Sequence, residues 1–357
     1  MDKVYTILAI NPGSTSTKIA VYDNEICRFK VMIQHSTDEL TPFTKVYDQY
    51  EFRRALVEKT LAENGITAAD LSAVVGRGGP IKPIASGTYA VNDAMYNDLR
   101  FHPQVEHVSN LGGLIARGIA ETANLPSFIV DPVSVDEFEP LARITGVPEI
   151  SRRSLFHALN LKAIAHRAAK DLQTDYNSMS LIMVHLGGGI SIGIQKKGKM
   201  IDVSNPNGSG PFSPERCGAI PAVDLVQMCY SGNFTLSEMM SKLVGKAGLV
   251  AHLGINDGRE IEQRIDRGDA KAALIFEAMA YQIAKEIGAM ATVVSGKVDA
   301  IVLTGGLAHS KRLVEWIIKR VSFIANVLVY PGEDELQSLA EGALRVLRGE
   351  EEAKIYS

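Results

Sequence analysis

The chain has 357 residues, more than the roughly 250 to 300 residues at which one hydrophobic core stops growing, so we expect two domains with a cleft between them. Hydrophobic residues make up 46% and charged residues 22%, which excludes disordered, collagen-like and disulfide-stapled chains. The net charge is −4 and no dense lysine or arginine tract occurs, so neither nucleic acid nor an anionic membrane is an expected partner.

The first half begins with a strand, a polar turn and a second strand. Residues 4–10 and 18–23 are rich in aliphatic side chains, and Asn11-Pro12-Gly13-Ser14 breaks the run. Apolar residues recur at helical spacing in residues 52–64 and 105–122, which predicts a helix in each segment. Short buried strands are predicted at 71–75 and 128–130, and they end in Gly76-Arg77-Gly78-Gly79 and Asp131-Pro132.

The second half repeats this plan. A strand at 181–186 runs into Gly187-Gly188-Gly189 and resumes at 190–194, and His185 follows Asn11 by 174 residues, about half of the chain. The two hairpins therefore indicate an internal duplication of one α/β domain. The remaining predicted elements are helices at 154–172, 271–294, 311–321 and 335–347, and a buried strand at 300–304 that ends in Gly305-Gly306.

The turns have the residue types of phosphate-binding sites. Hydroxyl groups, backbone N–H groups and Lys18 in the segment 11–18 can surround phosphate oxygens, although the segment is not a Walker A loop because a strand follows the lysine. The glycines at 187–189 and 305–306 allow a backbone to approach a nucleotide closely. Each turn taken alone could equally be an ordinary Ser/Thr-rich or glycine-rich turn.

Three widely spaced cysteines, Cys27, Cys217 and Cys229, indicate free thiols and not disulfides or a zinc site. The N-terminal residues lack the basic segment and apolar run of a signal peptide. The apolar segment 272–294 contains Glu277, Lys285 and Glu286, so we expect a buried helix there and not a membrane span. We therefore expect a cytoplasmic protein.

Five strings along the chain resemble the acetokinase family, within the superfamily of acetate and sugar kinases, heat-shock chaperones and actin. Within that family they are most similar to butyrate kinases. The resemblance spans Ile7 to Arg348, and its strings are Asn11-Pro12-Gly13-Ser14-Thr15-Ser16-Thr17-Lys18, Ser154-Leu155-Phe156-His157-Ala158-Leu159-Asn160, His185-Leu186-Gly187-Gly188-Gly189-Ile190-Ser191, Gly210-Pro211-Phe212-Ser213-Pro214-Glu215-Arg216 and Leu303-Thr304-Gly305-Gly306-Leu307-Ala308-His309.

The resemblance implies two duplicated actin-like, ribonuclease H-like α/β domains that flank a nucleotide cleft. We expect residues 1–135 plus 338–357 to bind acyl substrate and phosphate, and residues 136–337 to bind the nucleotide. The implied reaction uses ATP and Mg²⁺ to phosphorylate a short-chain carboxylate, reversibly, and the implied assembly is a homodimer or a multiple of one. Acetate kinases differ: they have a histidine where Leu161 stands and an asparagine within the His-Leu-Gly motif.

Butyrate is therefore the expected acid, with isobutyrate or propionate as the alternatives. An alternative of another class is a non-catalytic, actin-like nucleotide switch, which uses the same hairpins. Such a switch needs a partner-binding module, and the chain has no spare 100 residues for one.

The resemblance also assigns roles to residues. The implied catalytic residues are Arg77, Asp131, His157 and Arg216, of which the two arginines hold the carboxylate and the transferring phosphoryl group. Residues implied to bind the nucleotide and its phosphates are Asn11, Ser14, Ser16, Lys18, His185, Gly187, Gly188, Gly189, Asp257, Arg259, Gly305 and Gly306. The acid pocket is assigned to Arg77, His107 and Phe156, with Asn110 beside His107, and the metal to Asn11 and Glu335, with Glu333 as the other candidate.

Without the motif, each of these residues also has an ordinary structural interpretation. Arg77 and Arg216 could be surface arginines, His157 a hydrogen-bonded core histidine, and Asp131 a turn cap.

Overall fold

The computed structural model describes residues 3–357, which divide into two compact units. Unit 1 comprises residues 3–135, 158–163 and 334–357, and unit 2 comprises residues 136–157 and 164–333. Within residues 3–357, no helix is both long enough and apolar enough to cross a membrane.

Unit 1 is built on a six-stranded sheet in the order β3-β2-β1-β4-β6-β5. Strands β1, β4 and β6 are parallel, and β2, β3 and β5 pair antiparallel with their neighbours. The strands are β1 (Thr6–Pro12), β2 (Ser16–Asp23), β3 (Ile26–Gln34), β4 (Ala73–Arg77), β5 (Thr88–Ala90) and β6 (Ser127–Val130). The helices are α1 (Thr37–Leu40), α2 (Tyr50–Glu63), α3 (Asp93–Phe101), α4 (Asn110–Glu121) and α13 (Glu335–Leu347).

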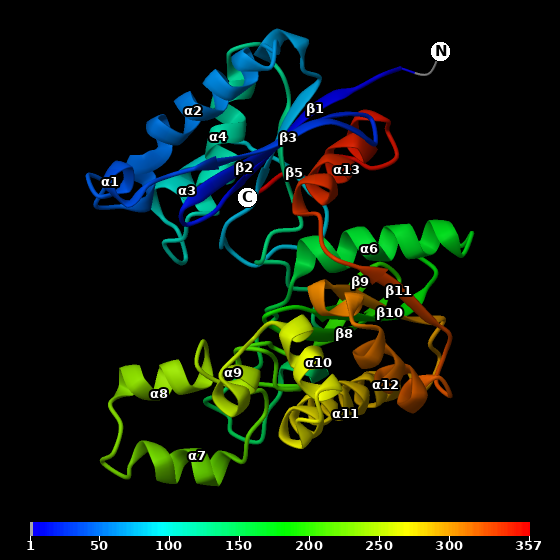
Figure 1. Ribbon diagram of the computed structural model, residues 1–357. Helices are drawn as coiled ribbons and strands as arrows, with labels where there is room; N and C mark the ends of the chain where they lie inside the picture. Colours follow the sequence, from blue (N-terminus) through cyan, green and yellow to red (C-terminus); the bar gives the residue numbers. More distant parts are fainter. Residues whose placement is uncertain (1–2) are drawn as a thin grey trace. The chain divides into compact units, whose positions relative to one another are not determined.

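Both faces of this sheet are covered by helices (Figure 1). Successive side chains of a strand point to opposite faces. Accordingly, Leu8 and Ile10 pack in the core with α2, α3 and α4, whereas Ile7 and Ala9 pack in the core with α13. The first strand is therefore buried on both sides, and its C-terminal end is held rigidly.

Close packing of α4 against β4 fixes the strand end that carries Arg77. A Cβ atom on Gly76 would overlap the backbone of Gly112, and one on Gly112 would overlap the carbonyl oxygen of Arg77. Only glycine at both positions permits this approach.

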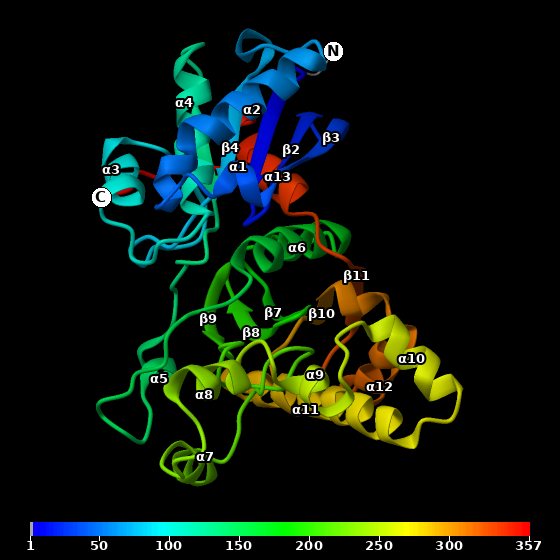
Figure 2. The ribbon, with the colours of Figure 1, turned by 60° about the vertical axis from the view of Figure 1, so that its left-hand side comes forward.

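Unit 2 is built on a five-stranded sheet in the order β11-β10-β7-β8-β9, with β7, β10 and β11 parallel. Figure 2 shows α11 on one side of β7 and β8. The strands are β7 (Ser180–Leu186), β8 (Ile190–Lys196), β9 (Lys199–Val203), β10 (Ala300–Gly305) and β11 (Val327–Pro331). The helices are α5 (Pro140–Arg143), α6 (Ala158–Asp171, divided between the units), α7 (Ala222–Cys229), α8 (Leu236–Leu243), α9 (Gly248–Leu253), α10 (Gly258–Asp266), α11 (Ala270–Val293) and α12 (Lys311–Val321).

Some boundaries differ from the sequence prediction. The first turn is shorter than expected, because Asn11 and Pro12 pair with Lys18 and Thr17 and so belong to the strands. Residues 158–163 and 334–337, expected in the second domain, group with unit 1. The reason is that Leu159 and Leu336 pack in the same core as Ile7 and Ala9.

Candidate functional site

The turn between β1 and β2 opens into a pocket of about 280 Å³, here called the turn pocket. It brings together seven predicted site residues of unit 1 that are distant in sequence. The lining residues are Asn11, Pro12, Gly13, Ser14, Ser16, Lys18, Arg77, His107, Val108, Ser109 and Glu335.

A carboxylate with two partners lies in the turn pocket. Glu335, the first residue of α13, accepts a hydrogen bond from Asn11 Nδ2 and forms an ion pair with Arg77. The carboxylate of Glu335 and the amide oxygen of Asn11 are the hard oxygen donors that Mg²⁺ prefers, and Mg²⁺ commonly takes only one or two protein carboxylates. Within residues 3–357 no cluster of three His, Cys, Asp or Glu side chains could hold a metal. One carboxylate and one amide oxygen, the donors present in the turn pocket, fit a magnesium ion held mainly by substrate phosphates and water.

The alternative metal residue, Glu333, lies elsewhere. It belongs to unit 2, is exposed, and has Oε2 3.5 Å from Nε2 of His185. Of the two glutamates, Glu335 is the one that shares a pocket with Asn11.

A buried arginine that the sequence analysis did not select holds the turn from behind. Arg53 on α2 has no exposed surface, and its guanidinium donates to the carbonyl oxygens of Gly13 (2.9 Å), Ser16 (3.0 Å) and Ser14 (3.1 Å) and to Oγ1 of Thr17 (3.0 Å). No carboxylate in the described chain, residues 3–357, pairs with it. Burial lowers the pKa of Arg53 to about 10, so the group is still charged at pH 7 and places a positive charge behind the turn.

A sequence signal for Arg53 did exist. The buried residues of α2 are Tyr50, Arg53, Val57 and Leu61, so the arginine occupies the apolar stripe of an amphipathic helix. A charged residue on such a stripe needs a dedicated partner, although the sequence does not say which one.

Other predicted residues of unit 1 lie outside the turn pocket. Asp131 is buried, has a positive φ of 37°, and accepts hydrogen bonds from Ser86 Oγ (2.6 Å) and the Gly87 backbone (2.7 Å). Burial raises the pKa of the Asp131 carboxyl, and the nearby Lys162 opposes that shift. Asp131 therefore holds residues 86–87, the turn that precedes β5.

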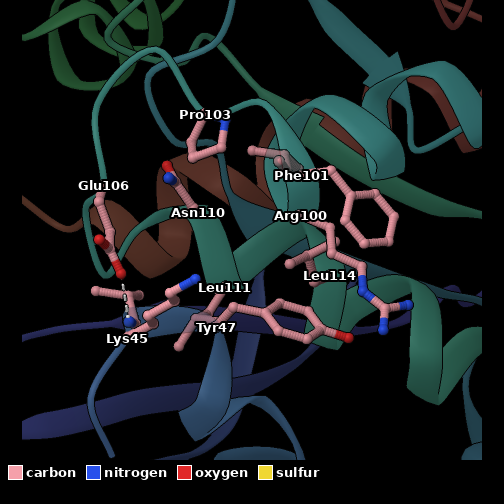
Figure 3. A pocket seen from close by; sticks show the side chains of 11 residues that line it. Lys45, Tyr47, Arg100, Phe101, Pro103, Glu106, Asn110, Leu111 and Leu114 are labelled. Carbon is pink, nitrogen blue, oxygen red and sulfur yellow. Dashed lines mark hydrogen bonds between the residues drawn. The ribbon is translucent and has the colours of Figure 1, made fainter.

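The loop before α4 contributes to two pockets. His107 lines the turn pocket, and partial burial of its ring together with the nearby Arg77 lowers its pKa. Asn110 and Glu106 instead line a second pocket of about 200 Å³, with Leu111 among its apolar residues (Figure 3). Asn110 thus borders a different pocket from His107.

In unit 2 two predicted histidines stack on one another. The rings of His157 and His185 lie 3.9 Å apart with an angle of 15° between their planes. Nδ1 of His157 is 2.9 Å from Oγ of Ser191, the residue that pairs with His185 across β7 and β8. Burial, followed by His157 and Arg216, holds the pKa of His185 well below its ordinary value, so this ring is neutral at pH 7.

The glycine turn after β7 makes room for functional side chains. A Cβ atom on Gly189 would overlap the guanidinium group of Arg216, and a Cβ atom on Gly187 would lie 2.6 Å from Nε2 of His185. Arg216 is partly buried, and this burial lowers its pKa. The turn therefore brings Arg216 close to the strand end that carries His185.

The same glycine turn borders a larger pocket of about 670 Å³ within unit 2. Asp257 caps α10 and binds Arg259, which lowers the pKa of Asp257 to about 2. The lining includes most of the segments predicted to hold the nucleotide: Gly187, Gly188, Pro214, Glu215, Asn256, Asp257, Gly258, Arg259, Glu262, Gly306, Leu307, His309 and Ser310.

Seven predicted site residues line neither the turn pocket nor the unit 2 pocket: Asp131, Phe156, His157, His185, Gly189, Arg216 and Gly305. Phe156 is buried and lines neither the turn pocket nor the unit 2 pocket. Gly305, with φ of 92°, sits against the backbone of Leu186, where a Cβ atom would overlap it, and so has a packing function.

Crystal structures of known kinases share this architecture. The chain is similar to the acetate kinase of Porphyromonas gingivalis (20% identity, 96% of this chain and 100% of that chain covered, TM-score 0.77). It is also similar to the acetate kinase of Entamoeba histolytica (18% identity, 94% of this chain and 98% of that chain covered, TM-score 0.74). A third similar structure is a propionate kinase of Francisella tularensis subsp. tularensis SCHU S4 (19% identity, 95% of this chain and 98% of that chain covered, TM-score 0.72).

These likenesses define the fold as the actin-like α/β fold of acetate and sugar kinases, as the sequence predicted. The family model of the acetokinase family matches residues 147–329, just over half of the chain. The protein belongs to the acetokinase family.

The position of Arg53 leads to a stability prediction. Arg53→Met should lower the free energy of unfolding by about 3–5 kcal/mol, because three backbone carbonyls of the turn lose their buried donor. Urea unfolding followed by circular dichroism measures this change. Lys59→Met on the same helix, where the lysine is exposed beside Glu63, is the control and should cost about 0.5 kcal/mol or less. Equal losses for both variants would contradict the role given to Arg53.

Proposed function

We propose that the protein is a butyrate kinase, which transfers the γ-phosphoryl group of ATP to butyrate and gives butyryl phosphate and ADP. Membership of the acetokinase family supports the general reaction, phosphoryl transfer between ATP and a carboxylate. The observation that carries most weight is the turn pocket, where Arg77 and Asn11 both contact Glu335 beside the hydroxyl-rich turn.

The chemistry explains why such a site needs cations more than a general base. Butyrate is already ionised at pH 7, so its carboxylate oxygen can attack phosphorus directly. The difficulty is that an anion must approach a polyanion, and the transition state spreads negative charge over the equatorial phosphoryl oxygens. When bound, Mg²⁺ neutralises part of the phosphate charge.

Each unit supplies residues in this proposal. In unit 1, Arg77 binds the carboxylate through its planar guanidinium group, and the turn at Ser14 and Ser16 donates to phosphate oxygens. In unit 2, Arg216 binds the transferring phosphoryl group and His157 donates to one of its oxygens. The pocket lined by Asp257 and its neighbours takes the nucleoside.

Propionate and isobutyrate remain the alternative substrates. A further methylene in an apolar pocket changes binding by about 1 kcal/mol, roughly fivefold, so neighbouring acids should be discriminated only modestly. The departures from acetate kinases, such as Leu161, favour a longer acid than acetate.

A non-catalytic nucleotide switch is the alternative outside the enzyme class. Such a protein would bind ATP and leave every carboxylate unmodified. The cluster of Arg77 with Glu335 and Asn11 favours the enzyme, because a nucleotide switch has no use for an arginine that binds a carboxylate substrate in the turn pocket.

We expect the highest kcat/KM with butyrate, and values about threefold to tenfold lower with propionate and isobutyrate. Trapping the acyl phosphate with hydroxylamine across C2 to C5 acids measures this order. We also expect ATP to form efficiently from butyryl phosphate and ADP, because an acyl phosphate transfers its phosphoryl group more readily than ATP. ATP binding without acyl phosphate from any acid would favour the nucleotide switch.

Arg216→Ala should lower kcat at least a hundredfold while ATP affinity falls much less, because Arg216 acts on charge that develops during transfer. Turnover is measured by the hydroxamate assay and ATP affinity by calorimetry. Arg312→Ala, which removes a surface ion pair with Asp266 in the same unit, is the control and should leave both quantities unchanged. Unaltered turnover in Arg216→Ala would remove this residue from the mechanism.

We further propose that the protein forms a homodimer or a multiple of one through the α7–α8 arm, residues 220–244. No residue of α7 is buried, although its composition is apolar, and Tyr230 and Leu236 are 88% and 80% exposed. An uncovered apolar surface of this kind marks an interaction site. On α8, Glu238 and Lys242 are four residues apart, so two antiparallel copies of this helix would pair opposite charges across a twofold axis.

Leu236→Glu should therefore dissociate the dimer, because it places a charge in an apolar contact. Sedimentation velocity measures the mass of the particle. Phe323→Glu, at a residue that is 85% exposed outside the arm, is the matched control and should retain the native assembly. A monomeric wild-type protein would contradict the proposal.

A further inference from the structure

The contact between Ser191 and His157 bears on which ring nitrogen of His157 carries the proton. His157 precedes α6, and its Nδ1 lies 2.9 Å from Oγ of Ser191 on β8. The side chain of Ser191 has no exposed surface, so water cannot satisfy its hydroxyl group.

A buried hydroxyl hydrogen needs an acceptor. Within the described chain, residues 3–357, the one side-chain hydrogen bond of Ser191 is the contact with His157 Nδ1. The hydroxyl of Ser191 therefore donates to Nδ1, which must be unprotonated, and the proton of the neutral imidazole is on Nε2.

The neighbouring groups favour the same uncharged state. His185 is stacked on His157 at 3.9 Å, so a positive charge on one ring disfavours a positive charge on the other, and Arg216 adds a positive charge nearby. Arg216 would repel a positive charge on His157. The opposite charge of Glu333, whose Oε2 is 3.5 Å from His185 Nε2, is screened by water because that side chain is 47% exposed. Protonating Nδ1 of His157 would also leave the Ser191 hydroxyl without its acceptor.

We propose that Ser191 is a positioning residue: its hydroxyl group holds the His157 ring in one orientation and in the tautomer that carries the proton on Nε2. The catalytic part of this inference rests on the proposed function: His157 in this tautomer has an uncharged Nε2–H group that donates to a phosphoryl oxygen during transfer. The positive charge at the reacting group is then supplied by arginine and metal and not by histidine.

The test is to compare Ser191→Ala with the wild-type protein by ¹⁵N NMR of the histidine side chains. Only eight histidines occur, and His157→Gln identifies the His157 signals. We expect the proton of His157 on Nε2 in the wild type, and a second tautomer with the proton on Nδ1 in Ser191→Ala. In the kinase assay we expect kcat to fall about tenfold, as for loss of one neutral hydrogen bond, with KM for ATP nearly unchanged.

Ser204→Ala is the matched control. Ser204 is equally buried and hydrogen-bonds to the backbone of Ile192 in the same unit, so its removal should leave both the tautomer and kcat unchanged.

Two results would overturn the inference: a wild-type proton on Nδ1 of His157, or a single unchanged tautomer in Ser191→Ala. A shifted tautomer with unchanged kcat would overturn the catalytic part. NMR detects the tautomer without substrate, so this test remains decisive even if the protein phosphorylates no carboxylate. Failure to phosphorylate any carboxylate would instead refute the proposed function.

Discussion

The unit 1 site depends on a buried positive charge behind the turn between β1 and β2. Arg53 satisfies the carbonyl oxygens of Gly13, Ser14 and Ser16, which would otherwise be free to turn toward a bound anion and repel it. Among residues 3–357 this guanidinium has no acidic partner, so its field extends toward the turn pocket. The shape of the turn and the positive charge behind it thus have a common cause.

In unit 2, the small size of glycine fixes the positions of the site side chains. Gly187 and Gly189 leave space for the ring of His185 and the guanidinium of Arg216, so that both groups lie beside one strand end. The histidine stack and the buried Ser191 hydroxyl then restrict the orientation of His157. In both units, buried residues behind a short turn fix the shape of the site at the end of a strand.

Much of the fold could be predicted from local sequence. The duplicated hairpins, the glycine turns and the strand ends at Arg77 and Gly305 are encoded by alternation and by glycine, which act over a few residues. Contacts made by distant residues could not be read in this way. The role of Arg53 depends on a helix that starts more than 30 residues after the turn, and the hydrogen bonds of Asp131 depend on Ser86 and Gly87. Motif resemblance also could not show that Asn110 and His107 border different pockets.

The return of α13 to the first sheet has a consequence for synthesis on the ribosome. Asn11 and Glu335 are 324 positions apart, and α13 also covers the face of β1 that carries Ile7 and Ala9. While a nascent chain is still being extended, that face has no cover and the pocket lacks its carboxylate. Unit 1 can therefore reach its final structure only after α13 has been synthesised, and until then the apolar face of β1 stays exposed.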